Sequence, residues 1–235
     1  MIIECRDLLI GYEGKPVAPK LNFGIEKGDY VCIVGENGAG KTTLMKTLLG
    51  LKPKLDGEIR IDADVKNSIG YVPQLTQMQK DFPASVYEVV LSGALSLSIF
   101  KPFYSKRDKE EANIAMEKMG LKDLHNRCYR ELSGGQQKRV MLARAMVNDK
   151  KVLFMDEPTA GLDPMVIAEM YELIEDFNKS GMTIVMISHD IHKSLEYANK
   201  ILHVGANVFW GTNAEYLNSP IGQSYLVLSG EKNDR

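Results

Sequence analysis

The sequence contains few cysteines, a single tryptophan and no long hydrophobic run. Its 235 residues include three cysteines, which are odd in number and scattered along the chain. This distribution argues against a disulfide framework and a zinc ribbon, and it suits a reducing compartment. The stretch nearest to a membrane span, residues 89–100, is too short for one and contains serine and glycine. Charge interrupts the first residues, so no signal peptide is expected. We expect a chain that does not cross a membrane by itself.

The sequence also lacks a large excess of charge of either sign. Lys and Arg number 29, Asp and Glu number 31, and the net charge is -2. A general nucleic-acid footprint is therefore not indicated. With 44% hydrophobic and 26% charged residues, and with no internal repeat, the composition is that of a globular protein with a sizeable core.

Three short apolar runs rich in valine and isoleucine predict buried strands at residues 30–35, 151–156 and 183–188. Each run is followed by a helix candidate. After the second run, apolar residues recur at spacings of three and four, and Ser180-Gly181 closes that element. Alternating strands and helices predict a mixed α/β protein with a largely parallel sheet.

The front and the middle of the chain show other patterns. Residues 1–30 and 57–72 predict short alternating strands with glycine turns, as in an antiparallel edge sheet. From about residue 76 to 149 the pattern is helical and predicts an inserted helical lobe. One of its helices is expected to begin near Ser105 and to end at Gly120. Its apolar face comprises Ala112, Ala115, Met116 and Met119.

A glycine-rich loop follows the first predicted core strand. Residues 35–43 read GENGAGKTT, which is Gly, four residues, and then Gly-Lys-Thr. Glycines let backbone N–H groups turn inward around phosphate oxygens, and the next helix presents its positive N-terminal end. We expect Lys41 to reach the β- and γ-phosphates and Thr42 to offer its hydroxyl to Mg²⁺. The alternative is a glycine turn that binds nothing. The phosphate-binding candidates are Gly35, Asn37, Gly38, Gly40, Lys41, Thr42 and Thr43.

Two carboxylates stand at the end of the second predicted strand, in the segment VLFMDEP (152–158). Ligands of open α/β sheets gather at the carboxyl ends of the strands. We expect Asp156 to hold Mg²⁺, directly or through water, and Glu157 to polarise the attacking water. The alternative is that Asp156 caps a turn and Glu157 is a solvated loop residue.

A histidine follows the third predicted strand. His189 would face the γ-phosphate there, and we favour a phosphate-sensing role for it. His189 and His192 could share a helix face and bind a metal ion, but no third ligand is evident. A histidine at a strand end is more often a satisfied structural group, and His192 receives no role.

In chain order, the segments GENGAGKTT, YVPQ, LSGGQQKR, VLFMDEP, AGLD and SHD resemble the nucleotide-binding subunit of ABC transporters. The resemblance covers nearly the whole chain, and the motifs are specific as a series. It implies an α/β fold of the P-loop NTPase (ABC ATPase) type in a single domain, residues 1–235. A RecA-like core with an antiparallel β subdomain would comprise about 1–75 and 150–235. An inserted α-helical subdomain would comprise about 76–149.

The resemblance further implies ATP and Mg²⁺ as cofactors, and a homodimer with ATP sandwiched between the subunits. The start of the LSGGQQKR helix would offer a second anion-binding site to the ATP of the partner subunit. A monomer should therefore hydrolyse ATP poorly. The residues expected to act in trans are Ser133, Gly134, Gly135 and Gln136.

The other roles implied by the resemblance fall on single residues. Tyr12 matches the aromatic residue that stacks on adenine, although it could be an ordinary strand tyrosine. Gln74 in YVPQ matches the glutamine that touches Mg²⁺ and the attacking water, and that senses the membrane partner. Asp163 matches the aspartate that communicates across the dimer. The family often has serine at the position of Ala160, so any contact from that hydroxyl is absent.

The resemblance implies an integral membrane permease subunit as partner, and indirectly an extracytoplasmic substrate-binding protein. The chain would then be peripheral, at the cytoplasmic face of the cell membrane. Phe82, Pro83 and Val86, within residues 81–93, would receive a helix of the permease, although core packing explains each of them as well. This stretch and YVPQ are similar to subunits of zinc- and manganese-type uptake systems.

Other classes of protein share parts of this motif set. Chromosome-maintenance ATPases carry a long coiled coil between the two halves, and the insert here is too short and lacks heptads. Translation factors usually carry two cassettes, and a small-molecule P-loop kinase would lack the second glycine segment. A soluble ABC ATPase of iron–sulfur cluster assembly, or an ABC importer subunit for another cargo, remains an alternative.

Overall fold

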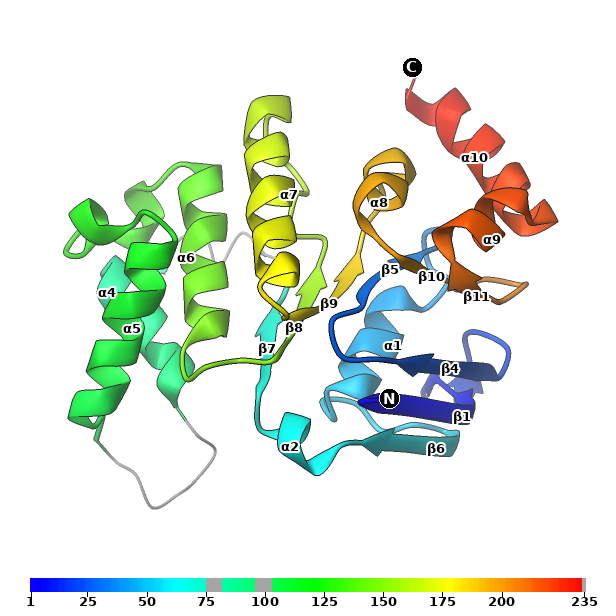
Figure 1. The fold of residues 1–235 in the computed structure, drawn as a ribbon, viewed down its shortest axis with the longest axis horizontal. Coiled ribbons are helices and arrows are strands. Elements are labelled where there is room, and N and C mark those ends of the chain that lie inside the picture. Colours follow the sequence, from blue (N-terminus) through cyan, green and yellow to red (C-terminus); the bar gives the residue numbers. More distant parts are fainter. Residues whose placement is uncertain (75–81, 96–102, 234–235) are drawn as a thin grey trace. The chain divides into compact units, whose positions relative to one another are not determined.

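The computed structural model describes residues 1–74, 82–95 and 103–233. The chain forms two compact units (Figure 1). The first comprises residues 1–67 and 173–235, and the second comprises residues 68–172. The segment predicted to be helical, residues 76–149, belongs to the second unit. No helix among the described ranges is long and apolar enough to span a membrane.

In the first unit, an antiparallel sheet has the strand order β4-β1-β6. Its strands are β1 (Ile3–Leu9), β4 (Leu21–Ile25) and β6 (Asp56–Ile61). β1 and β4 alternate in burial, with the side chains of Ile3 and Cys5 in the core, because one face of each strand is covered. The antiparallel sheet expected from the front of the chain is confirmed for these strands.

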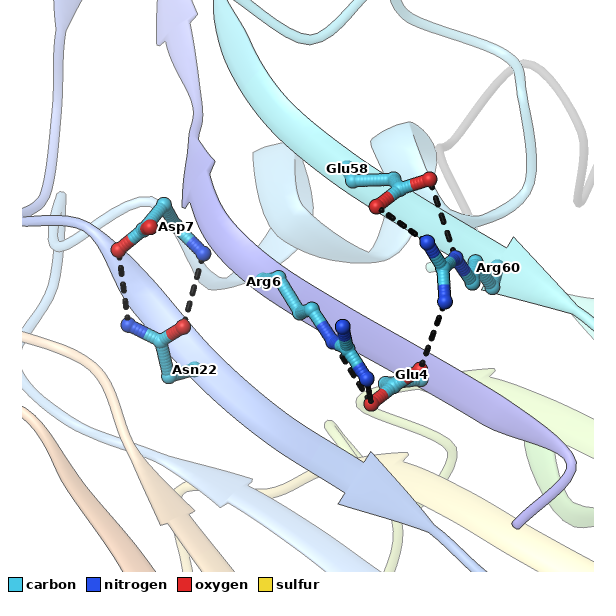
Figure 2. Close-up of polar contacts among 6 residues, drawn as sticks. All are labelled: Glu4, Arg6, Asp7, Asn22, Glu58 and Arg60. Atoms are coloured by element: carbon cyan, nitrogen blue, oxygen red, sulfur yellow. Dashed lines mark hydrogen bonds and ion pairs between the residues drawn. The ribbon is translucent and has the colours of Figure 1, made fainter.

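The exposed face of this sheet carries polar contacts across the strands (Figure 2). Glu4 lies opposite Arg60, and Arg6 lies opposite Glu58. Arg6 donates to Glu4 at 2.6 Å within β1, and Arg60 donates to Glu58 at 3.0 Å within β6. Between the strands, Arg60 forms an ion pair with Glu4 at 3.9 Å. Opposite charges at facing positions of neighbouring strands stabilise the register. The two arginines and Glu58 are exposed and Glu4 is half-buried, so each pair contributes only about 0–1 kcal/mol.

The first unit also contains strands in the order β11-β10-β5-β9. They are β5 (Tyr30–Val34), β9 (Thr183–Ile187), β10 (Lys200–His203) and β11 (Phe209–Thr212). β5 pairs in parallel with β9 and with β10, while β11 is antiparallel to β10. Every residue of β5 and β9 is buried, as their continuous apolar runs predicted.

The remaining elements of the first unit are short helices and a two-stranded ribbon. The ribbon pairs β2 (Gly11–Tyr12) with β3 (Lys15–Pro16). Helix α1 (Lys41–Leu48) begins directly after the glycine-rich loop. The other helices are α2 (Ala63–Lys66), α8 (Ile191–Tyr197), α9 (Asn213–Asn218) and α10 (Pro220–Asn233).

The second unit contains two parallel strands, β7 (Ile69–Val72) and β8 (Val152–Asp156). The prediction that residues 57–72 form only antiparallel strands is therefore wrong for 69–72. The burial of β7 alternates, which gave it the pattern of an antiparallel strand. Its buried Gly70 lies so close to helix α6 (Gly134–Met146) that a Cβ there would be 2.3 Å from the carbonyl oxygen of Ala145. β8 is buried throughout, as expected.

The helices of the second unit include α4 (Val86–Leu91), α5 (Lys106–Lys118) and α6 (Gly134–Met146). Short 3-10 turns lie at Ser92–Ala94, Lys122–Leu124 and Tyr129–Glu131. α5 begins as predicted after Ser105, which forms a capping box with Asp108, and its predicted apolar face is buried. α7 (Pro164–Lys179) starts in this unit and runs into the first, with proline at its first position.

Candidate active site

The glycine-rich loop of the first unit has the backbone that phosphate binding requires. Gly35, Gly38 and Gly40 have positive φ angles of 140°, 81° and 95°. A Cβ at Gly35 would lie 2.0 Å from the carbonyl oxygen of Val204, so only glycine fits there. Gly40 is the N-cap of α1 and has no side chain to cap the helix. The first N–H groups of α1 are thus presented at a positive helix end, which suits an anion.

Lys41 is folded back across this loop. Its ammonium donates hydrogen bonds to the carbonyl oxygens of Gly35 at 2.7 Å and Glu36 at 2.9 Å. The side chain is only 6% exposed. A buried ammonium in this position can transfer its hydrogen bonds from the carbonyls to phosphate oxygens. Asn37 and Gly38 are exposed, and Thr42 and Thr43 are half-buried at the start of α1.

The C-terminal part of the chain contacts the same loop, which the sequence pattern did not predict. The hydroxyl of Tyr225, on α10, donates to the carbonyl oxygen of Gly35 at 3.0 Å. The ring of Tyr225 meets that of His203 edge-on, with 5.0 Å between centroids. The Nδ1 atom of His203 and the hydroxyl of Tyr216 share a hydrogen bond of 2.8 Å. Burial lowers the pKa of His203. The negative charge of Glu36 raises this pKa, and the positive charge of Lys41 lowers it further.

Tyr12 stands on the short ribbon of the first unit and is 62% exposed. The ammonium of Lys52 lies 3.6 Å from the centre of its ring. This cation–π contact covers one face of the ring and restrains its orientation. An exposed, restrained aromatic ring can stack on a flat base, and the predicted adenine contact of Tyr12 stays a prediction.

His189 follows β9 and is exposed. Next to it, the backbone N–H of Asp190 donates to the hydroxyl of Ser188 at 3.1 Å. The Asp190 carboxylate accepts from the N–H of Lys193 at 3.0 Å and so caps the start of α8. These local contacts fix the turn that carries His189.

In the second unit, Asp156 and Glu157 stand at the end of β8. Asp156 is 1% exposed, and burial together with its carboxylate raises the pKa of neighbouring Tyr71 to about 12. The side-chain amide of Gln74 donates to Oε2 of Glu157 at 2.8 Å. The structure thus joins Gln74 and Glu157, which are 83 residues apart in the chain. An amide that holds one carboxylate oxygen orients the carboxylate.

Glu157 also has an unusual backbone. Its φ is 52°, in the left-handed region that residues with a side chain seldom adopt. Lys138, on α6, donates from Nζ to the carbonyl oxygen of Glu157 at 3.3 Å. Lys138 is 4% exposed. The sequence pattern did not predict a role for this lysine, because the LSGGQQKR motif indicated only the anion-binding start of the helix.

The start of α6 is well formed. Ser133 accepts from the N–H of Gln136 at 3.3 Å, and the Gln136 side chain accepts from the N–H of Ser133 at 3.1 Å. Ser133 and Gly134 are exposed, so a second molecule can reach the helix end. A Cβ at Gly135 would lie 2.7 Å from Val166, near the start of α7. The exposed Asp163 immediately precedes α7, so these two predicted regions are close together.

The predicted Mg²⁺ ligands are a hydroxyl, an amide and a carboxylate, from Thr42, Gln74 and Asp156. These are the oxygen donors that Mg²⁺ accepts, and the remaining positions of its octahedron would be filled by water and phosphate oxygens. Among the described residues, no group of three or more His, Cys, Asp or Glu is arranged to hold a metal ion. The magnesium site stays a prediction.

Comparison with known proteins identifies the family. Residues 19–160 match a family described as ABC transporter. The chain is 37% identical to the manganese transport system ATP-binding protein MntB of Bacillus subtilis (strain 168), over 85% of this chain and 82% of the relative. It is also 37% identical to the zinc transport system ATP-binding protein TroB of Treponema pallidum (strain Nichols), over 88% and 79%.

The fold is similar to that of a solved ABC transporter structure. A structure described as an inward-facing conformation of a putative metal-chelate type ABC transporter superposes with a TM-score of 0.84 and 30% identity. The match covers 96% of this chain and 89% of the other. These similarities confirm the predicted P-loop NTPase fold of the ABC type. The chain belongs to the ABC transporter family and is one of its ATP-hydrolysing, ATP-binding subunits.

Proposed function

We propose that this subunit hydrolyses ATP as a homodimer and thereby drives a permease that takes up zinc or manganese. One observation carries the catalytic part: the loop lysine and Glu157 are each held in defined contacts. Lys41 is buried in its phosphate loop, and Glu157 is oriented by Gln74 at 2.8 Å. A catalytic carboxylate must be held in one direction to polarise water, and this contact does so.

The proposed roles follow the chemistry of each group. The loop N–H groups and Lys41 bind the β- and γ-phosphates, with Asn37, Thr43 and the loop glycines shaping the cradle. Mg²⁺, held by Thr42, Asp156 and Gln74, would neutralise charge on the phosphates. Glu157 polarises the attacking water, and His189 contacts the γ-phosphate. Tyr12 stacks on the adenine.

The proposed dimer explains the second anion-binding helix start. Ser133, Gly134, Gly135 and Gln136 would bind the ATP held by the other subunit, and Asp163 would communicate across the interface. ATP carries several negative charges, so two positive helix ends can share it and hold the subunits together. Hydrolysis removes the shared group and lets the dimer open.

The cargo and partners are proposed from the relatives. MntB and TroB are described as ATP-binding proteins of manganese and zinc transport systems. The proposed assembly contains a membrane permease and, outside the membrane, a substrate-binding protein. The subunit would lie at the cytoplasmic face, with Phe82, Pro83 and Val86 contacting the permease. Asp81, which opens the expected docking stretch, lies outside the described residues.

The alternative of a soluble ABC ATPase in iron–sulfur cluster assembly gains no support from these relatives. Their descriptions are of transport systems for manganese, zinc or metals. We therefore retain the metal transport subunit as the single proposed function.

The proposal is tested with the chain and a candidate permease of the same organism, reconstituted together in liposomes. Lys41→Ala should abolish ATP hydrolysis and the uptake of Zn²⁺ or Mn²⁺, measured by elemental analysis. Lys46→Ala is the matched control, because Lys46 is exposed on the same helix. Hydrolysis that survives the Lys41 change would contradict the catalytic assignment. ATP-dependent uptake of another cargo, with neither metal transported, would contradict the proposed cargo.

A further inference from the structure

Lys52 lies against the ring of Tyr12 in the first unit. Its ammonium is 3.6 Å from the ring centre, well within the range of a cation–π contact. Lys52 is half-buried, whereas Tyr12 is 62% exposed. Because the ammonium covers one face of the ring, the exposed area of Tyr12 belongs to the other face and to the ring edge. The ring therefore has one occupied face and one face that a flat ligand can reach.

The backbone of Lys52 is fixed to the helix that follows the glycine-rich loop. The N–H of Lys52 donates to the carbonyl oxygen of Lys46 at 3.2 Å, in the last turn of α1. The same helix starts at Gly40, its N-cap, in the glycine-rich loop. Helix α1 thus connects the loop expected to bind phosphate with the lysine that contacts the Tyr12 ring.

The ribbon that carries Tyr12 is held beside the same loop. Tyr12 precedes a tight turn of two residues with positive φ angles, Glu13 at 49° and Gly14 at 78°. After the ribbon, Val17 lies so close to the loop that a Cβ at Gly40 would be 2.6 Å from the Cγ2 atom of Val17. The backbone of Tyr12 therefore has a defined place next to the loop, and the rotation of its side chain is what remains to be restrained.

Restraint of this side chain matters for binding. An exposed aromatic side chain rotates about its χ angles, and a ligand that stacks on the ring must stop this rotation, which costs conformational entropy. A neighbour that already holds the ring lowers that cost and so strengthens binding. The ammonium of Lys52 is such a neighbour, because its attraction to the ring depends on the ring facing it.

We propose that Lys52 is a positioning residue for the nucleotide, whose ammonium holds the Tyr12 ring so that adenine stacks on the opposite face. This inference rests on the proposed adenine contact of Tyr12 and adds a second residue to it. In this arrangement Lys52 contacts the ring and not the nucleotide. It lowers the KM for ATP and leaves kcat nearly unchanged, because the ring takes no part in the hydrolysis step.

The test compares variants of the full chain by competition with a fluorescent ATP analogue. Lys52→Met keeps the length of the side chain and removes the cation. The Kd of ATP should rise about two- to tenfold, as expected when the ligand itself must immobilise one side chain. Lys52→Arg should keep most of the wild-type affinity, because a guanidinium also binds a ring face. Lys66→Met is the matched control, since Lys66 is exposed on α2 of the same unit.

Two further measurements separate positioning from a general loss of positive charge. Inorganic triphosphate has no base to stack, so its Kd should be the same for the wild type and for Lys52→Met. Tyr12→Ala should weaken the binding of ATP, and adding Lys52→Met to Tyr12→Ala should cause no further loss, because the ring that Lys52 holds is gone.

Three results would each overturn the inference: an unchanged Kd of ATP in Lys52→Met, an equal loss for ATP and triphosphate, or a further loss when Lys52→Met is added to Tyr12→Ala. ATP hydrolysis by the wild type is measured in parallel. Its absence would count against the proposed function. Normal ATP binding by Tyr12→Ala would remove the adenine contact and this inference with it, whereas a loss in Tyr12→Ala but not in Lys52→Met would refute the role of Lys52 alone.

Discussion

Replacing Lys138 by methionine should slow ATP hydrolysis while leaving ATP binding almost unchanged. The ammonium of Lys138 donates to the carbonyl oxygen of Glu157 at 3.3 Å, and Glu157 is held at a φ of 52°. A residue with a side chain in this region costs about 1–3 kcal/mol, which surrounding contacts must supply. Lys138 is one of these contacts. Without it, the peptide can relax and the carboxylate can leave its position next to Gln74.

The size of the effect follows from the contact. A hydrogen bond with a charged partner contributes about 1.5–3 kcal/mol, and a 3.3 Å bond belongs to the lower half of that range. At about 1.4 kcal/mol per tenfold change, kcat should fall roughly ten- to fortyfold. Methionine has a similar length and fills the buried site, and it removes the cost of burying an ammonium. The free energy of unfolding should therefore change little.

The assay compares kcat for ATP with the Kd of a fluorescent ATP analogue. Lys118→Met is the control, since Lys118 is exposed on α5. Lys138→Arg retains a charged donor and should keep more activity than Lys138→Met. A folded Lys138→Met protein with kcat within twofold of wild type would refute the reasoning. Equal losses of ATP binding and of turnover would do so as well.

Three other predictions use the same assays. Glu157→Gln keeps an oxygen that can accept the hydrogen bond from Gln74 but cannot act as a base. The turnover of ATP should therefore fall by a factor of about 10²–10⁴, while ATP still binds and a closed dimer accumulates, as measured by size-exclusion chromatography. Undiminished turnover would contradict the catalytic role of Glu157. Ser133→Arg should block ATP-driven dimerisation but not ATP binding by a single subunit, and an unchanged ATP-bound dimer would argue against the contact in trans. Tyr225→Phe removes the hydrogen bond from the Tyr225 hydroxyl to the carbonyl oxygen of Gly35, so the KM for ATP should rise severalfold while kcat stays nearly constant. An unchanged KM would show that this hydrogen bond does not stabilise the phosphate-binding loop.

The strands and helices with strong local patterns were predictable. Residues of β5, β8 and β9 are apolar except for Thr183 and Asp156 at strand ends, because both faces of these strands are buried. α5 was predictable from its serine cap and its apolar face. β7 was assigned the wrong pairing, because its alternating burial resembles that of an antiparallel strand. Strand direction depends on a partner far away in the chain, which a local pattern does not contain.

In the candidate site, too, some features follow from local sequence patterns and others depend on contacts between distant segments. The phosphate loop, the acidic pair and the start of α6 could be predicted from the sequence, because each depends on residues within a few positions of one another. The folded structure alone shows that Tyr225 contacts the loop, that Gln74 and Lys138 contact Glu157, and that the Tyr129 hydroxyl is buried with no hydrogen-bond partner among the residues that the structure describes. Burial and long-range hydrogen bonds arise when distant segments pack, so no spacing of residues along the chain encodes them directly.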